Sequence, residues 1–127
     1  PAQLFLCNWS AIFNDVYDEI FEERDDHAGE METSLALAWW PELVARNPDG
    51  SLTADEGRKA ATRLEAVNRG WVSITRPWHL LTTNAGAGNP HAATAEKGRR
   101  LTELLVERIA GFLVELSGAE VDERFPY

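Results

Sequence analysis

Residues 27–34 read His-Ala-Gly-Glu-Met-Glu-Thr-Ser, and they stand where a charged segment gives way to an apolar helix. The imidazole of His27 and the carboxylates of Glu30 and Glu32 surround Gly29, whose missing side chain permits a backbone turn. Imidazole is the side chain most often used for proton transfer near neutral pH. This stretch therefore predicts the start of a helix and, beside it, a candidate catalytic group.

Apolar residues at helical spacing predict helices over residues 10–21, 30–40, 53–69 and 101–116. Pro41 ends the second of these, because its ring and missing N–H oppose a further helical turn. The last helix has the most continuous apolar stripe, and Ser117-Gly118 supplies its stop. Its members are Leu101, Leu104, Leu105, Ile109, Phe112, Leu113 and Leu116. The chain is therefore rich in helix, with acidic residues on the outer faces.

Two short segments read as strands. Gln3 to Asn8 is an apolar run typical of a strand buried on both faces, and Trp71 to Thr75 alternates with the period of a strand. Cys7 has apolar neighbours and is expected to be a buried, inert thiol. Two strands cannot make a stable sheet that is covered by several helices. The predicted fold class is therefore α/β, with further strands missing or supplied by another chain.

Composition limits the class of function. The chain has 127 residues and a formal net charge of −9, with a pI near 4.7. An acidic chain without clustered Lys and Arg is not expected to bind nucleic acid, because phosphate contacts need such clusters. No apolar run approaches the roughly 18 residues of a membrane-spanning helix, and the one cysteine fits a reducing compartment. We expect a soluble, cytoplasmic protein of one domain or part of one, with no membrane role.

The side chains of the motif allow more than one interpretation. His27 is either a general acid and base or a surface histidine that bridges neighbouring acids. Glu32, in the first turn of its helix, either orients the imidazole, binds a substrate ammonium or a metal, or is simply an acid favoured by the helix dipole. Trp9 follows a predicted strand, where ligand clefts of α/β sheets lie. His79 and His91 lie in predicted loops without ligand-like spacing to any carboxylate, so this chain is not expected to complete a metal site by itself.

Three segments of the sequence resemble the C-terminal half of the creatininase (creatinine amidohydrolase) family. They are residues 27–35 (HAGEMETSL), 41–44 (PELV) and 93–98 (ATAEKG). The resemblance implies a three-layer α/β/α fold that is incomplete in this chain, with residues 1–127 as the C-terminal part of a single domain. It also implies two divalent metal ions, zinc or manganese, hydrolysis of a small cyclic amide, and assembly into a homo-oligomer, commonly a hexamer.

The resemblance also assigns roles to residues. His27 matches the family's catalytic histidine, which moves a proton between the attacking water and the leaving nitrogen, and Glu32 supports it. Trp9 matches a tryptophan at the edge of the active site, and Gly29 and Arg24 are further expected substrate contacts. Glu23 and Arg24 stand where creatininase itself has a Trp-Asp pair that closes over creatinine. Creatinine is therefore not expected to be the substrate.

The family's metal ligands belong to Glu-x-His, Asp and His-x-Glu elements of the N-terminal half, and none of these elements is present here. The chain is therefore expected to be a fragment, or one product of a split or cleaved enzyme, whose companion holds the metals. One alternative is a ring-opening hydrolase of a cyclic keto-sugar of the inosose type, since Arg24 suits a polyol. Another alternative is a non-catalytic structural or interaction subunit with the same fold.

Overall fold

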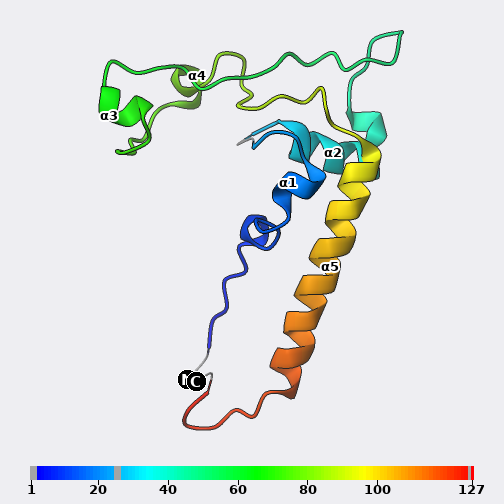
Figure 1. Ribbon diagram of the computed structural model, residues 1–127, viewed down its shortest axis with the longest axis vertical. Coiled ribbons are helices and arrows are strands. Elements are labelled where there is room, and N and C mark those ends of the chain that lie inside the picture. Colours follow the sequence, from blue (N-terminus) through cyan, green and yellow to red (C-terminus); the bar gives the residue numbers. More distant parts are fainter. Residues whose placement is uncertain (1–2, 25–26, 126) are drawn as a thin grey trace.

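The computed structural model describes residues 3–24, 27–125 and 127, and in it a short helix packs against one end of a long one (Figure 1). Helix α2 spans Glu30–Trp39 and helix α5 spans Ala95–Gly118. The hydroxyl of Thr94 accepts a hydrogen bond from the backbone N–H of Lys97 at 3.2 Å, which caps the start of α5. Both helices were predicted from the sequence, and both predictions are confirmed.

Helices α2 and α5 cross with their backbones almost in contact. A Cβ atom placed on Gly98 would lie 2.0 Å from the carbonyl oxygen of Ser34 and 2.9 Å from Cβ of Ala38. The Ser34 hydroxyl is fully buried at the same crossing and accepts a hydrogen bond from the N–H of Thr94 at 3.2 Å. Only glycine allows this approach, which fixes α2, and the motif at its start, against α5.

Replacement of Gly98 by alanine is expected to destabilise the protein by about 1–3 kcal/mol, because the added methyl group forces the two helices apart. Gly111, on the same helix, is a matched control, since a Cβ there meets no atom within 4 Å. Gly111→Ala should be neutral or stabilising by up to about 1 kcal/mol, through helix propensity alone. Urea unfolding of the complete protein that contains these residues measures both changes. Equal effects at the two positions would contradict the close crossing.

The first predicted helix is interrupted. Residues 10–21 form a 3₁₀ turn, η1 (Trp9–Ala11), then further turns, and only a short helix α1 (Tyr17–Ile20). The carbonyl of Ile12 accepts a hydrogen bond from Arg108 of α5, so a tertiary contact takes a backbone group that a continuous helix would use. The apolar spacing nevertheless identified the right side chains. The core consists of Phe13, Tyr17, Ile20, Phe21 and Leu101, with Val16, Met31, Leu35, Leu104 and Leu105 packed around it.

The two predicted strands are not formed. Within the described residues the only β pairing consists of three isolated bridges, His27 with Ala87, Arg46 with Leu52 and Lys59 with Thr82. Residues 3–8 and 71–75 pair with no neighbour among the described residues, and a single strand has no stability without one. Leu4 and Leu6 are each 97% exposed. Cys7 is also exposed, so the prediction of a buried thiol is wrong.

Residues 40–94, between α2 and α5, extend away from these helices as a long, mostly irregular segment, which we call the excursion (Figure 1). It contains a 3₁₀ turn η2 (Pro41–Leu43) and two short helices, α3 (Glu65–Asn68) and α4 (Trp78–Leu81). The predicted helix over 53–69 is therefore wrong except at its end. The reason is that its backbone amides bond elsewhere: Gly57 donates to the carbonyl of Gly88 at 2.9 Å, and Ala60 to that of Leu81 at 2.7 Å. Residues 76–91 contain Pro77, Gly86, Gly88 and Pro90, which is typical of a loop, and they are irregular apart from α4.

Much apolar surface of the described residues faces solvent. Trp39, Trp40, Trp71 and Trp78 are all exposed, so none of them belongs to the core. The apolar stripe of α5 is buried at Leu101 but exposed at Phe112 and Leu113. No helix in the described part of the chain has the length and apolar character that crossing a membrane requires.

Candidate active site

His27 and Glu32 meet at the start of α2. The imidazole Nδ1 lies 3.3 Å from Oε2 of Glu32, and both side chains are about half exposed. The same carboxylate oxygen accepts a hydrogen bond from the backbone N–H of Ala28 at 2.7 Å. Glu32 lies in the first turn of the helix, at the positive end of the helix dipole. One carboxylate therefore holds both the turn that carries His27 and one nitrogen of its ring.

The turn between His27 and α2 is built differently from the expectation. Gly29 does not adopt a left-handed conformation: its φ is −92°, and it is buried at the N-cap of α2. The positive φ, 55°, belongs to Ala28. A left-handed conformation at a residue other than glycine carries strain, and the hydrogen bond from Ala28 to Glu32 helps to maintain it.

Residues from the long excursion cover the other side of His27. The N–H of Ala87 donates to the carbonyl of His27 at 2.8 Å, which forms the antiparallel bridge between them. The indole of Trp78, from α4, meets the imidazole edge to face, with ring centroids 5.2 Å apart and planes at 84°. Sequence reasoning missed Trp78 as a site residue. The only available signal was its place in a long loop, and such loops are often functional.

A buried ion pair fixes the segment that precedes His27. Glu30 is fully buried, and its Oε1 accepts a hydrogen bond from Nζ of Lys97 in α5. Its Oε2 accepts from the backbone N–H groups of Glu22, at 2.7 Å, and Glu23, at 3.3 Å. Nζ of Lys97 also donates to Oε1 of Glu22 at 3.1 Å and to the carbonyl of Ala92 at 3.0 Å.

These contacts set the charge state of Lys97. Burial lowers the pKa of the Lys97 ammonium, but the hydrogen bonds and charges of Glu30 and Glu22 outweigh it, so that the pKa lies above its ordinary value. The lysine therefore stays charged at neutral pH. A charged pair joins α2, α5 and the segment before His27 at one point.

The other predicted substrate contacts are not brought to His27. Trp9 packs against Phe13, with ring centroids 6.0 Å apart. The guanidinium of Arg24 donates two hydrogen bonds of 3.1 Å to Asp18 and lies 4.8 Å above the ring of Tyr17. Arg24 also borders a polar hollow of about 500 Å³, which Ala87, the backbone partner of His27, borders from the other side.

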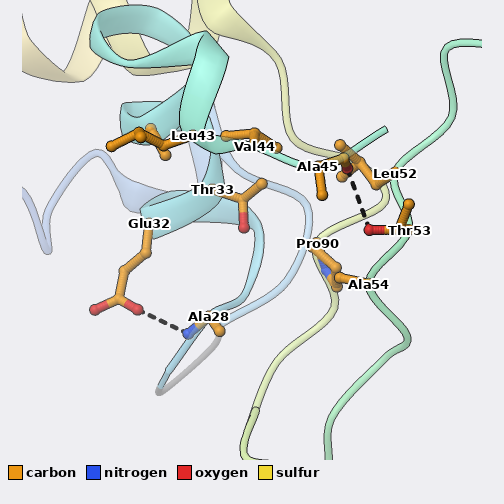
Figure 2. A pocket seen from close by; sticks show the side chains of 11 residues that line it. Ala28, Glu32, Thr33, Leu43, Val44, Ala45, Leu52, Thr53, Ala54 and Pro90 are labelled. Atoms are coloured by element: carbon orange, nitrogen blue, oxygen red, sulfur yellow. Dashed lines mark hydrogen bonds between the residues drawn. The ribbon is translucent and has the colours of Figure 1, made fainter. Parts of the chain in front are cut away.

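A second, more apolar pocket adjoins the carboxylate of Glu32. Its volume is about 340 Å³, and Figure 2 shows Glu32 and Thr33 of α2 on one side of it. Apart from Ala28, the other residues labelled around it come from the segment between α2 and α5: Leu43, Val44, Ala45, Leu52, Thr53, Ala54 and Pro90. The site therefore offers one acidic group beside a surface of small apolar side chains.

The residues that the structure describes do not fit a metal centre. Across residues 3–24 and 27–125, no group of three or more His, Cys, Asp or Glu side chains could hold a metal ion. His27 and Glu32 provide two donor groups, and these already contact each other. Transition-metal sites need at least three protein ligands on rigid elements.

The sequence and the fold were compared with known proteins. The sequence model of the creatininase family, described as creatinine amidohydrolase, matches residues 3–113. A curated relative is the mycofactocin precursor peptide peptidase of Mycobacterium ulcerans (strain Agy99), which is 35% identical over 83 residues, 65% of this chain and 30% of that protein. A crystal structure from Bacteroides fragilis NCTC 9343, of a protein provisionally assigned as a creatinine amidohydrolase, superposes with a TM-score of 0.74 at 35% identity.

The superposition covers 92% of this chain and 44% of the Bacteroides protein. The chain thus spans less than half the length of either relative. The match of the family model nevertheless extends over most of the chain and includes the His27 motif, α2 and most of α5. On this ground the chain belongs to the creatininase family, as its motifs predicted.

Proposed function

We propose that this chain carries the proton-transfer group of a metal-dependent amide hydrolase. The observation that supports this most is the contact between Nδ1 of His27 and the carboxylate of Glu32, at the start of α2. A carboxylate on Nδ1 keeps a proton on that nitrogen and leaves Nε2 free to exchange protons with a substrate. In a family named for an amidohydrolase, the bond to be broken is a C–N amide bond.

In this proposal Nε2 of His27 first accepts the proton of the attacking water and then donates it to the leaving nitrogen. Glu32 stabilises the imidazolium between these two steps, because its negative charge lies next to Nδ1. Ala28 and Ala87 hold the backbone on either side of the imidazole, through their bonds to Glu32 and to the carbonyl of His27.

Members of the creatininase family generally depend on a divalent metal, whose chemistry is to activate water. Since the described residues do not fit a metal centre, we place the two expected zinc or manganese ions on ligands outside residues 1–127. The N-terminal half of the same enzyme, or a companion chain, would supply these ligands. The exposed apolar side chains of residues 3–8 and the exposed end of the α5 stripe are surfaces that such a partner would cover.

The substrate class proposed is a small cyclic amide or a related ring, with Arg24 and the polar hollow beside Ala87 as the substrate contacts of this chain. The named activity of the Mycobacterium ulcerans relative adds the peptide amide as a second candidate. We also expect assembly into a homo-oligomer, as the family resemblance implied.

The substrate class is tested with a set of cyclic amides, short peptides and an inosose, each incubated with the complete protein. Hydrolysis of a C–N amide bond, seen as a new carboxylate in the opened ring or as two peptide fragments, supports the proposal, whereas ring opening of the inosose alone, or no turnover at all, would count against it.

Replacement of Glu32 by glutamine is expected to lower kcat by about 10- to 100-fold, with the fold intact. The amide keeps an oxygen that can accept the hydrogen bond from Ala28, but it loses the negative charge beside Nδ1 of His27, and an interaction with a charged group contributes about 1.5–3 kcal/mol. Glu103→Gln, at an exposed position of α5, is the control. Steady-state kinetics of the two variants measure the difference. A Glu32→Gln protein with unchanged kcat would remove Glu32 from the proposal.

A further inference from the structure

The indole of Trp78 is placed to control the orientation of the His27 ring. The two rings meet edge to face, with centroids 5.2 Å apart. Such contacts are attractive and favour this geometry over others. Glu32 contacts the imidazole at Nδ1, whereas the indole of Trp78 packs against the imidazole ring in an edge-to-face contact. The contact with Glu32 involves one ring nitrogen, and the indole is a second group that restricts rotation of the imidazole about its Cα–Cβ and Cβ–Cγ bonds.

The indole itself is held in place. Its Nε1 donates a hydrogen bond to the carbonyl of Ala85 at 2.9 Å. Ala85 has a φ of 71°, in the left-handed region that residues other than glycine rarely adopt. Strained backbone of this kind persists only where neighbouring contacts maintain it, and it concentrates at functional sites. The bond to Trp78 is one such contact.

The turn that carries Ala85 is also fixed by hydrogen bonds of the neighbouring Asn84 side chain. The side-chain amide of Asn84 donates to the carbonyls of Asp55 and Glu56, at 3.3 and 3.2 Å, and its oxygen accepts from the N–H of Gly86 at 3.2 Å. Ala87, two residues after Ala85, then bonds to the backbone of His27. The turn therefore contacts His27 directly, through the backbone of Ala87, and it also holds the indole of Trp78 that packs against the His27 ring.

We propose that Trp78 is a positioning residue for His27: it fixes the imidazole plane so that Nδ1 faces Glu32 while Nε2 faces the substrate. This inference rests on the proposed function, since it needs His27 to transfer protons. Trp78 is 43% exposed. Its indole is therefore not a core side chain, and its removal should change the site more than the fold.

The test uses the complete protein and three variants. Trp78→Leu keeps an apolar side chain but removes the aromatic face, and Trp78→Phe keeps an aromatic ring without the bond to Ala85. Trp71→Leu is the matched control, because Trp71 is 72% exposed and stacks on Arg69, away from His27. We expect Trp78→Leu to lower kcat by about 10- to 100-fold with KM within about twofold, as misorientation of a catalytic group does. Trp78→Phe should recover most of that loss, and Trp71→Leu should match the unmodified protein.

A second readout does not depend on turnover. Nitrogen-15 NMR of the histidine side chains distinguishes a proton on Nδ1 from a proton on Nε2. We expect one tautomer for neutral His27 in the unmodified protein, with the proton on Nδ1, and a mixture in Trp78→Leu. Unchanged kcat and an unchanged tautomer in Trp78→Leu, with His27→Ala inactive, would overturn the role of Trp78 and leave the proposed function standing. Parallel losses of kcat, substrate affinity and thermal stability in both Trp78 variants would mean a purely structural role, and would overturn it as well. A fully active His27→Ala protein would overturn the proposed function itself.

Discussion

Replacement of His27 by alanine is expected to lower kcat of the complete protein by about 10²–10⁴-fold, which is the usual contribution of a positioned general acid and base. The loss should occur in kcat rather than in KM, because the imidazole is proposed to act on the transition state and not to bind the substrate. The structure favours this role since one ring nitrogen faces Glu32 and the backbone carbonyl of the residue is tied to Ala87.

His91→Ala is the matched control, because this histidine is also exposed and lies in the loop before α5. Its kcat should stay within about twofold of the unmodified protein. Free imidazole added to the His27→Ala protein should restore part of the turnover, since it can occupy the space of the lost ring and transfer the same proton. Full turnover of His27→Ala without imidazole would refute the proton-transfer role.

Replacement of Lys97 by methionine is expected to destabilise the protein by about 3–5 kcal/mol. The substitution leaves the carboxylate of Glu30, which is fully buried, without its cation, and an unpaired buried charge carries a cost of this size. It also removes the hydrogen bonds from Nζ to Glu22 and to the carbonyl of Ala92. Chemical unfolding of the complete protein measures the change in free energy of unfolding.

Two variants control this experiment. Arg69→Met breaks the exposed pair of Arg69 with Glu65, and it should change the free energy of unfolding by at most about 1 kcal/mol. The double variant Lys97→Met with Glu30→Gln should recover part of the loss, because no charge is then left buried. If Lys97→Met were no more destabilising than Arg69→Met, the ion pair would have no role in fixing the segment before His27.

The pair also has a defined pH dependence. The pKa of Lys97 is raised in the folded protein, so its contribution to stability is fully present below the ordinary value of 10.5. The contribution is lost as the pH rises through the higher, folded value. Stability measured near neutral pH should therefore not vary with the ionisation of Lys97, and the loss should begin only in strongly alkaline solution.

Sequence reasoning predicted those elements whose stability is local. Helix α2 has Glu32 in its first turn and Pro41 just after its end, and α5 has a capping Thr94 and a long apolar stripe, so both could be read from the sequence. The segment over 53–69 had similar local signals. Its backbone amides instead bond to residues 81–88, and such long-range partners leave no trace in a single sequence.

The two strand predictions were wrong for a related reason. Residues 3–8 have the composition of a buried strand, but a strand is stable only beside another, and the described residues provide none. The side chains that the apolar pattern marked as buried, such as Leu4 and Leu6, are exposed instead. That a further chain segment covers them stays a prediction.

The same distinction holds for the site. His27 and Glu32 are close in the sequence, and one helix turn brings them together, so their pairing was predictable. Trp78 and Lys97 reach the same region from the excursion and from α5. Their contacts depend on the tertiary fold. Lys97 lies within a segment that carries the family resemblance, residues 93–98, but nothing in the sequence predicted its pairing with Glu30, and Trp78 had only its place in a loop. Family resemblance carries roles onto motif residues such as His27 and not onto residues outside the motifs.

The central claim is that His27 faces a catalytic cleft whose metal ions are bound by residues outside 1–127. The most direct measurement is anomalous diffraction from crystals of the complete protein grown with zinc or manganese. We predict metal peaks beside the His27 imidazole, with every protein ligand outside this stretch of chain. Metal bound by side chains of residues 1–127, or an imidazole that faces bulk solvent away from every metal peak, would contradict the account.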